Sequence, residues 1–343
     1  MLIARNLSKT YKTNTKKSLF SKSNIKYVEA VRDVSLKIEQ GKIVGLLGIN
    51  GAGKTTTIKM LSTMIEPTSG SLQINDVDGI KQYKKVKEKI NVIAGGERNL
   101  YWRLTAVENL QYFGGLYSLD KDVLNSRISR LIELVGLTEA KDTPVERYSK
   151  GMKQRLQIAR GLINDPEFLF LDEPTLGLDI SIAKELRSYI RHIADTENKG
   201  VLLTTHYISE AEELCDYIYI IDKGAIINEG TPDGLKRMLK TSNEILYKID
   251  KFAKLPFDEI EKLIEKDGSL SFANDSKTDF QINSDTEYTA DIIKILTKHD
   301  ISVFEMKRSE AKLEDLLLEL LTDGGKNEEF TKDSKSRNSE AAS

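Results

Sequence analysis

The run from Gly48 to Thr55 constrains this chain more than any other stretch, because it follows the pattern G-x-x-x-x-G-K-T of a phosphate-binding loop. Residues 43–47 before it form an apolar run typical of a buried parallel strand, and residues 55–65 after it carry apolar side chains at helical spacing. Glycines let a backbone wrap around phosphates, and a helix N-terminus favours an anion. The pattern therefore predicts a nucleotide site in an α/β fold.

Two side chains of this loop have specific expected roles. Lys54 should reach the β- and γ-phosphates of the nucleotide, and the Thr55 hydroxyl should ligate Mg²⁺. The other predicted contacts come from the loop and the first helical turn: Gly48, Asn50, Gly51, Ala52, Gly53 and Thr56. A chance glycine-rich turn is the alternative, but it does not account for a strand, a loop and a helix in register.

Two further apolar strands end in chemically active side chains. Residues 168–171 are apolar and run into Asp172 and Glu173, and a buried strand does not end in adjacent acids without a reason. Beside a phosphate-binding loop, Asp172 is expected to serve Mg²⁺ and Glu173 to polarise the attacking water; a charged strand exit is the alternative. Residues 201–205 form another apolar strand, and His206 follows it directly. Ligand sites of open α/β sheets lie at this end of the strands.

Composition limits the classes of partner. The 343 residues carry a formal net charge of −2, so no bulk attraction to nucleic acid is expected. The single cysteine, Cys215, excludes an internal disulfide and fits a reducing compartment. No secretory signal and no run long enough to span a membrane are expected, so a membrane role would come through a partner or the surface.

A lysine-rich segment, residues 12–26, separates two tyrosines that could stack on adenine. Tyr11 precedes the segment and Tyr27 follows it, and either could instead be ordinary strand packing. The segment has five lysines and no acid, which predicts a solvated loop; contact with anionic lipid head groups is the alternative. Strands are expected at residues 2–7 and 31–39 on either side.

The middle of the chain is predicted to be helical, with helices near 105–117 and 121–135. Trp102, the only tryptophan, precedes them and is either packed under a loop or an exposed anchor for a partner. Ser149 and Gly151 lie at the start of a later helix, whose N-terminus would be a second site suited to an anion.

From about residue 236 a second pattern begins. Its expected strands and helices follow the order β-α-β-β-α-β, which predicts a small ferredoxin-like α+β domain at 236–322. A final helix is expected to pack on this domain through five leucines, Leu313, Leu316, Leu317, Leu320 and Leu321, with binding of a partner helix as the alternative. Residues 323–343 are polar and are expected to be disordered.

Taken in order, Gly48–Thr55, Tyr148–Met152, Phe168–Glu173, Asp179 and His206 resemble the ATP-binding subunit of an ABC transporter, of the type 2 exporter kind found in daunorubicin resistance and nodulation-factor export. The resemblance covers residues 1 to about 235. It implies a P-loop ATPase core, with a RecA-like sheet, an antiparallel β subdomain and a helical subdomain near residues 97–160.

The resemblance also implies roles for single residues. Lys54 and Thr55 belong to Walker A, Asp172 to Walker B, Glu173 is the general base and His206 the switch histidine. Ser149 and Gly151 would bind the γ-phosphate of ATP held by another subunit, and Asp179 would belong to the D-loop. Each chain carries one loop and one signature, so a head-to-tail homodimer would make two complete sites.

One position departs from the family pattern. A glutamine that contacts Mg²⁺ and senses the membrane partner usually follows the strand ending near Ile93, but no glutamine lies between Gln82 and Gln111. Gly96 or Glu97 takes its place, and the Glu97 carboxylate could serve Mg²⁺ instead.

The leading hypothesis is therefore an ATP-hydrolysing subunit at the cytoplasmic side of the membrane, a homodimer that powers an exporter through integral membrane permease subunits. A soluble ABC ATPase acting on ribosomes or nucleic acid is one rival, although such proteins usually carry two cassettes or long coiled coils. A regulatory subunit that binds but does not hydrolyse ATP is the other, and Glu173 and His206 argue against it.

Overall fold

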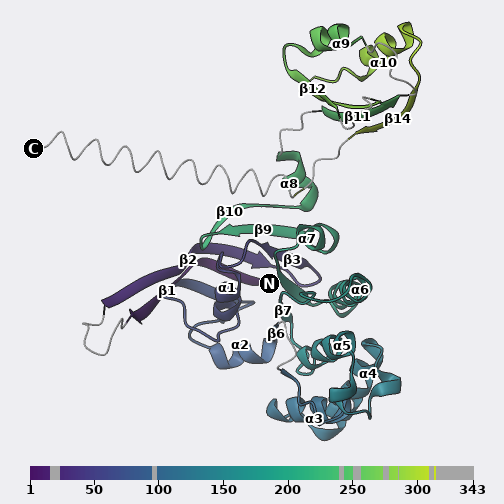
Figure 1. The fold of residues 1–343 in the computed structure, drawn as a ribbon. Coiled ribbons are helices and arrows are strands. Elements are labelled where there is room, and N and C mark those ends of the chain that lie inside the picture. The colour runs from purple at the N-terminus through teal and green to yellow at the C-terminus, as the bar shows by residue number, and fades with distance from the viewer. Residues whose placement is uncertain are drawn as a thin grey trace, which may run out of the picture. The chain divides into compact units, whose positions relative to one another are not determined.

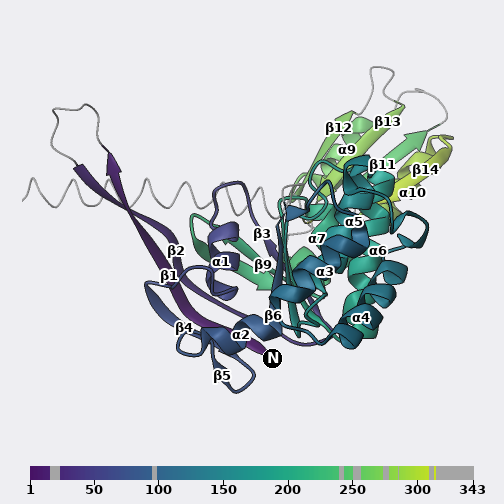
Figure 2. The ribbon, with the colours of Figure 1, turned by 90° about the horizontal axis from the view of Figure 1, so that it is seen from below.

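The computed structural model describes residues 1–15, 24–94, 99–238, 243–249, 256–272, 278–284, 286–308 and 313. The chain separates into two compact units, Met1–Pro232 and Asp233–Ser343, each with its own core. Figures 1 and 2 show their elements from two directions.

The first unit is built on a six-stranded sheet that carries the phosphate-binding loop. The strand order is β10-β9-β3-β8-β7-β6, in which β3, β8, β7, β6 and β9 run parallel and β10 pairs antiparallel with β9. Every residue of β3 is buried, as predicted for its apolar run. The strands are β3 (Ile43–Leu47), β6 (Ile90–Ala94), β7 (Phe168–Asp172), β8 (Gly200–Thr205), β9 (Tyr217–Asp222) and β10 (Ala225–Gly230).

A second, antiparallel sheet has the order β2-β1-β4-β5. Beyond Thr10, β1 pairs only with β2, and the two strands extend as a ribbon away from the rest of the unit (Figure 2). The prediction of a loop over residues 12–26 is therefore wrong for 12–15 and 24–26, which are strands; residues 16–23 lie outside the described part. The strands are β1 (Leu2–Thr15), β2 (Asn24–Ile38), β4 (Ser69–Ile74) and β5 (Val77–Asp78).

Helices surround these sheets in the first unit. The two helices predicted near 105–117 and 121–135 are present as α3 and α4, and a capping box at Thr105 and Glu108 begins α3. The helices are α1 (Lys54–Leu61), α2 (Tyr83–Lys89), α3 (Ala106–Leu116), α4 (Lys121–Leu134), α5 (Lys150–Gly161), α6 (Ile180–Glu197) and α7 (Ile208–Leu214), with short 3₁₀ turns at Thr138–Ala140 and Val145–Arg147. A further helix, α8 (Pro232–Met238), begins where the first unit ends.

The second unit has the predicted ferredoxin-like arrangement. Its antiparallel sheet has the order β12-β13-β11-β14, and α9 and α10 follow β11 and β13 in the chain. The elements are β11 (Asn243–Ile249), α9 (Phe257–Ile264), β12 (Gly268–Phe272), β13 (Asp279–Ser284), α10 (Thr289–Lys298) and β14 (Val303–Arg308). Leu313 is buried, whereas the other four leucines of the predicted last helix and the tail 323–343 lie outside the described residues.

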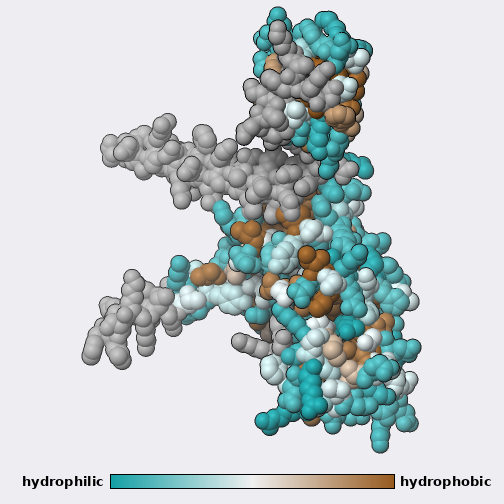
Figure 3. Space-filling view, turned by 45° about the vertical axis from the view of Figure 1, so that its right-hand side comes forward, coloured by the Kyte–Doolittle hydropathy of each residue, from teal (hydrophilic) through white to brown (hydrophobic). Residues whose placement is uncertain are grey.

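The described surface is mixed in character. On the face drawn in Figure 3, hydrophilic side chains predominate and apolar areas lie between them. Among the described helices, none has the length and apolar character required to cross a bilayer.

Candidate functional site

The phosphate-binding loop joins the end of β3 to the start of α1. No side chain caps the N-terminus of α1, which leaves N–H groups of its first turn available to an anion. Gly53 has φ of 111°, and a Cβ there would lie 2.8 Å from the carbonyl oxygen of Ala30. A Cβ at Gly48 would lie 2.4 Å from the carbonyl oxygen of Ile221. Both positions therefore require glycine if the loop is to keep this curvature.

Lys54 is 5% exposed and its ammonium lies inside the loop. Its Nζ donates to the carbonyl oxygens of Gly48 at 2.7 Å and Ile49 at 3.2 Å, and lies 3.3 Å from Oε1 of Glu173. A buried ammonium requires such partners. A phosphate entering the loop would be a stronger partner than two carbonyl groups, because both the donor and the acceptor of its hydrogen bond to Lys54 would then carry a charge.

Asp172 and Thr55 come together from two different elements. The Thr55 hydroxyl donates to Oδ2 of Asp172 at 3.0 Å, and the Thr204 hydroxyl donates to Oδ1 at 2.6 Å. Sequence reasoning missed Thr204; the only signal was a polar residue near the end of the apolar run 201–205. Because its hydroxyl fixes one carboxylate oxygen, Asp172 keeps the other oxygen directed towards Thr55.

Glu173 lies at the centre of the site. Its Oε1 is 3.3 Å from Nδ1 of His206 and also 3.3 Å from Nζ of Lys54. Its backbone has φ of 50°, a left-handed conformation uncommon for non-glycine residues, whose strain active sites can retain. The Glu173 N–H donates to the carbonyl oxygen of Thr204 at 3.1 Å, which holds this turn against β8.

The sheet explains why these residues meet. β8 lies between β3 and β7, so the carboxyl ends of the three strands are neighbours. Lys54 follows β3, Asp172 ends β7 and His206 follows β8. The structure therefore brings these predicted site residues together at one edge of the sheet.

The two candidate tyrosines lie on opposite faces of the β1–β2 ribbon. Lys9 Nζ lies 5.7 Å from the Tyr11 ring centroid and donates to the carbonyl oxygen of Glu66, so Tyr11 is on the side of the segment that follows α1. Tyr27 pairs with Lys12, next along the strand from Tyr11, and is 66% exposed. Successive side chains alternate between faces, so Tyr27 is directed away from that side.

Ser149, Gly151 and Asp179 do not join the cluster around Glu173 but lie next to one another in the fold. Ser149 caps α5, accepting a hydrogen bond from the Met152 N–H at 3.2 Å. The neighbouring Lys150 ammonium donates to the carbonyl oxygen of Gly177, and a Cβ on Gly151 would lie 2.8 Å from Ile182. The helix that begins at Ser149 therefore packs beside the segment around Asp179, which is exposed at the start of α6.

The structure describes only one of the two predicted features near residue 100, which are the position that replaces the family's glutamine and Trp102. Gly96 and Glu97 lie outside the described residues. Trp102 is 47% exposed, and Nζ of Lys153 on α5 lies 4.6 Å from its ring centroid. Trp102 is therefore about half exposed rather than fully covered, and both interpretations, packing under a loop and an anchor for a partner, stay predictions.

The residues present fit a magnesium nucleotide. Among the described residues, no group of three or more His, Cys, Asp or Glu side chains could hold a metal ion alone. Mg²⁺ is usually bound by one or two protein oxygens together with substrate phosphates. The adjoining oxygens of Thr55 and Asp172 supply such a pair beside an anion-ready loop.

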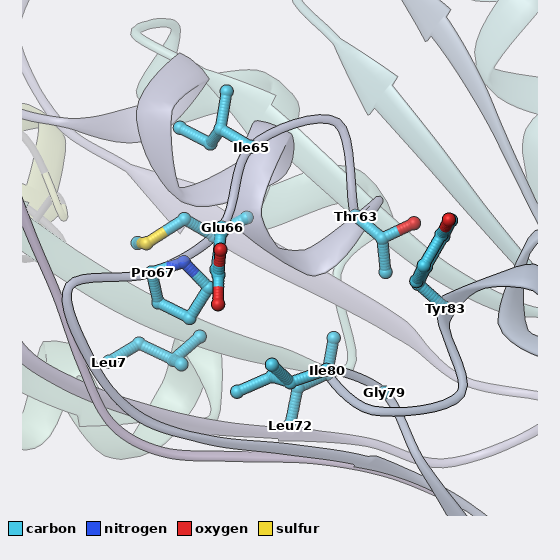
Figure 4. A pocket seen from close by; sticks show the side chains of 10 residues that line it. Leu7, Thr63, Ile65, Glu66, Pro67, Leu72, Gly79, Ile80 and Tyr83 are labelled. Carbon is cyan, nitrogen blue, oxygen red and sulfur yellow. The ribbon is translucent and has the colours of Figure 1, made fainter.

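A separate apolar cavity of about 340 Å³ is lined in part by the end of α1 and the segment that follows it (Figure 4). None of the predicted nucleotide contacts lines it, so it is not part of this site. Thr63, whose φ is 56°, and Tyr83 lie at one end of the cavity. The remaining lining residues are Leu7, Met60, Ile65, Glu66, Pro67, Leu72, Gly79 and Ile80.

Comparisons with known proteins agree with this geometry. Residues 31–176 match the family described as ABC transporter. The ABC transporter ATP-binding protein NatA of Bacillus subtilis is 44% identical over 61% of this chain and 85% of its own length. The linearmycin resistance ATP-binding protein LnrL of the same organism is 32% identical over 93% of this chain and 98% of its own length. This chain belongs to the ABC transporter family.

Further matches confirm the resemblance to exporter subunits and the fold. A daunorubicin resistance ATP-binding protein of Streptomyces coeruleorubidus is 38% identical over 61% of this chain and 65% of its own length. A solved ATP-binding subunit of an ABC transporter is 28% identical, with a TM-score of 0.56, over 69% of this chain and 92% of the other. This ABC subunit thus has the predicted cassette fold with an additional C-terminal unit.

Proposed function

We propose that this chain hydrolyses ATP to ADP and phosphate and thereby powers an exporter whose membrane-spanning part is formed by separate permease subunits. The observation that carries the proposal is the convergence of Lys54, Thr55, Asp172, Glu173 and His206 at the ends of three adjacent strands. Export is supported by the linearmycin- and daunorubicin-resistance relatives. The ATP-binding domain would span residues 1–235.

Each residue at this edge has a role that its contacts support. Lys54 would exchange the carbonyl oxygens of Gly48 and Ile49 for phosphate oxygens, and Thr55 and Asp172 would hold Mg²⁺. When bound, Mg²⁺ offsets the negative charge of the phosphates. The Glu173 carboxylate would accept a proton from the attacking water, with His206 fixing its orientation.

The position of the α5 N-terminus, the second predicted anion site, supports the predicted homodimer. Ser149 and Gly151 pack beside the segment of Gly177 and Ile182. In a head-to-tail dimer, the Ser149 terminus of one subunit would complete the site formed by the loop of the other. Tyr11, on the side of α1, would stack on adenine.

Permease docking would use the region from Glu97 to Val107. Two side chains at its centre, Tyr101 and Trp102, are 46% and 47% exposed, and aromatic residues are enriched at the centres of interfaces. Tyr101 lies 4.7 Å from the ring of Tyr112, so the exposed surface is aromatic over more than one element. A cytoplasmic helix of the permease is the proposed occupant.

The test begins with a search of the neighbouring reading frames for a membrane protein of several spans, followed by its co-expression with this chain. The expected result is co-purification in detergent and ATP hydrolysis that changes on reconstitution into vesicles. A purified subunit that binds nucleotide but never hydrolyses it, alone or with that partner, would favour a regulatory subunit. Co-purification with ribosomes instead would favour the soluble rival.

A further inference from the structure

Glu210 is a buried carboxyl that none of the roles above uses. It lies on α7 and is 3% exposed, and no hydrogen bond of normal geometry reaches either carboxyl oxygen in the described part of the chain. Leaving a buried polar group unsatisfied is costly, so each such group requires an explanation. Isolation from water is itself sufficient to raise the pKa of Glu210 above its ordinary value.

The groups that face this carboxyl come from both sides of the proposed catalytic site. Four of them oppose the rise in the pKa of Glu210: the hydroxyls of Thr205 and Thr175, the guanidinium of Arg187 on α6 and the imidazole of His206. The fifth is the Cys215 thiol at the end of α7. Thr205 directly precedes His206 along the chain. Thr175 lies two residues after Glu173, on the segment that leads to Asp179.

Glu210 therefore lies between the turn that carries His206 and the segment that carries Asp179. Hydrogen bonds of active sites are often long without substrate and shorten in the reacting complex. A carboxyl accepts up to four hydrogen bonds, so one group can hold both threonine hydroxyls at once.

We infer that Glu210 is a positioning residue: its buried carboxyl lies between the hydroxyls of Thr175 and Thr205, ties these two segments together and so keeps His206 against Glu173. This inference rests on the proposed ATPase activity. It predicts an effect on turnover rather than on nucleotide affinity, because Glu210 touches neither loop nor phosphate. A purely structural glutamate would instead affect folding stability alone.

The primary test is Glu210→Gln, which keeps the shape but removes the ionisable group. We expect kcat to fall by about 10–100-fold, the order of loss that misplacement of catalytic groups causes, with KM for ATP nearly unchanged. The dependence of kcat on pH should also lose one ionisation in the variant. The matched control is Glu213→Gln on the same helix, whose exposed carboxylate pairs with the same Arg187 at 2.9 Å; its kinetics should equal those of the wild type.

A second pair of variants keeps the test decisive if Glu210→Gln does not fold. Thr175→Ser retains the hydroxyl and should retain kcat, whereas Thr175→Val removes it and should lower kcat with KM unchanged. Equal kcat in both threonine variants, or wild-type kinetics in Glu210→Gln across the pH range, would overturn the inference. If the wild-type protein itself hydrolyses no ATP, the proposed function fails first, and the two failures are thereby distinguished.

Discussion

The Oε1 atom of Glu173 lies 3.3 Å from Nδ1 of His206, although 33 positions of sequence numbering separate them. The two residues follow adjacent parallel strands, β7 and β8, so this contact is a direct consequence of the sheet order. The same oxygen is 3.3 Å from Nζ of Lys54. One carboxylate therefore joins the ends of three strands, and its removal should affect chemistry more than binding.

Glu173→Gln is expected to bind ATP and to hydrolyse it about 10²–10⁴-fold more slowly, because a positioned base is worth that much in rate. Unhydrolysed ATP should then hold the dimer together, which size-exclusion chromatography would show as an earlier elution with ATP than with ADP. Glu133→Gln, on the exposed surface of α4, is the control and should retain wild-type turnover. Near-normal hydrolysis by Glu173→Gln would exclude its role as base.

The elements that sequence reasoning identified correctly have strong local signals. The loop 48–55, the acids after residues 168–171 and His206 after residues 201–205 each follow an apolar strand, and parallel strands bring their carboxyl ends to one edge. The β-α-β-β-α-β order at the C-terminus was equally readable from alternating apolar residues. These features needed no knowledge of long-range pairing.

The features that were missed depend on contacts between distant segments. The ribbon of β1 and β2 has polar, lysine-rich strands, and only their mutual register, such as Thr13 opposite Lys26, makes them strands. Helix α2 has seven residues and a single buried one, Val86, too little for a periodic pattern. Thr204 was missed because its role depends on a hydrogen bond to Asp172 on the neighbouring strand, which the sequence does not show.

The register of β1 and β2 also distinguishes Tyr11 from Tyr27, between which the sequence did not decide as the residue that stacks on adenine. Tyr11→Ala should weaken ATP binding by about 1–3 kcal/mol, the usual loss when an aromatic partner of a base is removed. Tyr27→Ala is the matched control and should leave affinity unchanged, since its side chain is on the other face of the ribbon. Titration with a fluorescent ATP analogue measures both. Equal losses in the two variants would contradict the assignment.

A shared site can be tested by mixing two inactive proteins. Lys54→Ala removes the phosphate-binding cation, and Gly151→Asp places a like charge at the second anion site. Because a Cβ at Gly151 would contact Ile182, the second protein also carries Ile182→Ala, which alone should remain active. An equal mixture should recover about a quarter of wild-type activity, since half of the dimers would contain one good site of two. Mixed dimers can be isolated with a different affinity tag on each protein. If these dimers hydrolysed ATP only at the background rate, the shared site would be contradicted.

Asp216 should make stability depend on pH at the acid end. Burial tends to raise its pKa, but the Ile43 N–H at 2.8 Å, Arg191 at 3.1 Å and Lys42 at 3.4 Å outweigh this and hold the pKa below 3.8. A lowered pKa gives stability that is present above the unfolded-state value and is lost as the pH falls through the folded-state value.

Asp216→Asn should therefore lower the urea midpoint at neutral pH, and the difference from the wild type should shrink as the pH falls below 3.8. Asp142→Asn, at an exposed position, should show no such dependence. A constant difference across this pH range would indicate that Asp216 acts through packing rather than through its charge.

Trp102 offers the test of the permease surface. Its ring is about half exposed, and its described ring contact is with the ammonium of Lys153, so Trp102→Ala should lose a cation–π contact of about 0.5–1 kcal/mol and change the melting temperature little. Association with the permease should weaken by about 2 kcal/mol or more, because a central aromatic anchor carries that much. Hydrolysis by the isolated subunit should be nearly unchanged. Phe304→Ala, at a 75% exposed position of the second unit, is the control and should affect neither. If Trp102→Ala instead lowered the melting temperature strongly, and permease binding followed only the folded fraction, Trp102 would be a structural residue and the docking surface would lie elsewhere.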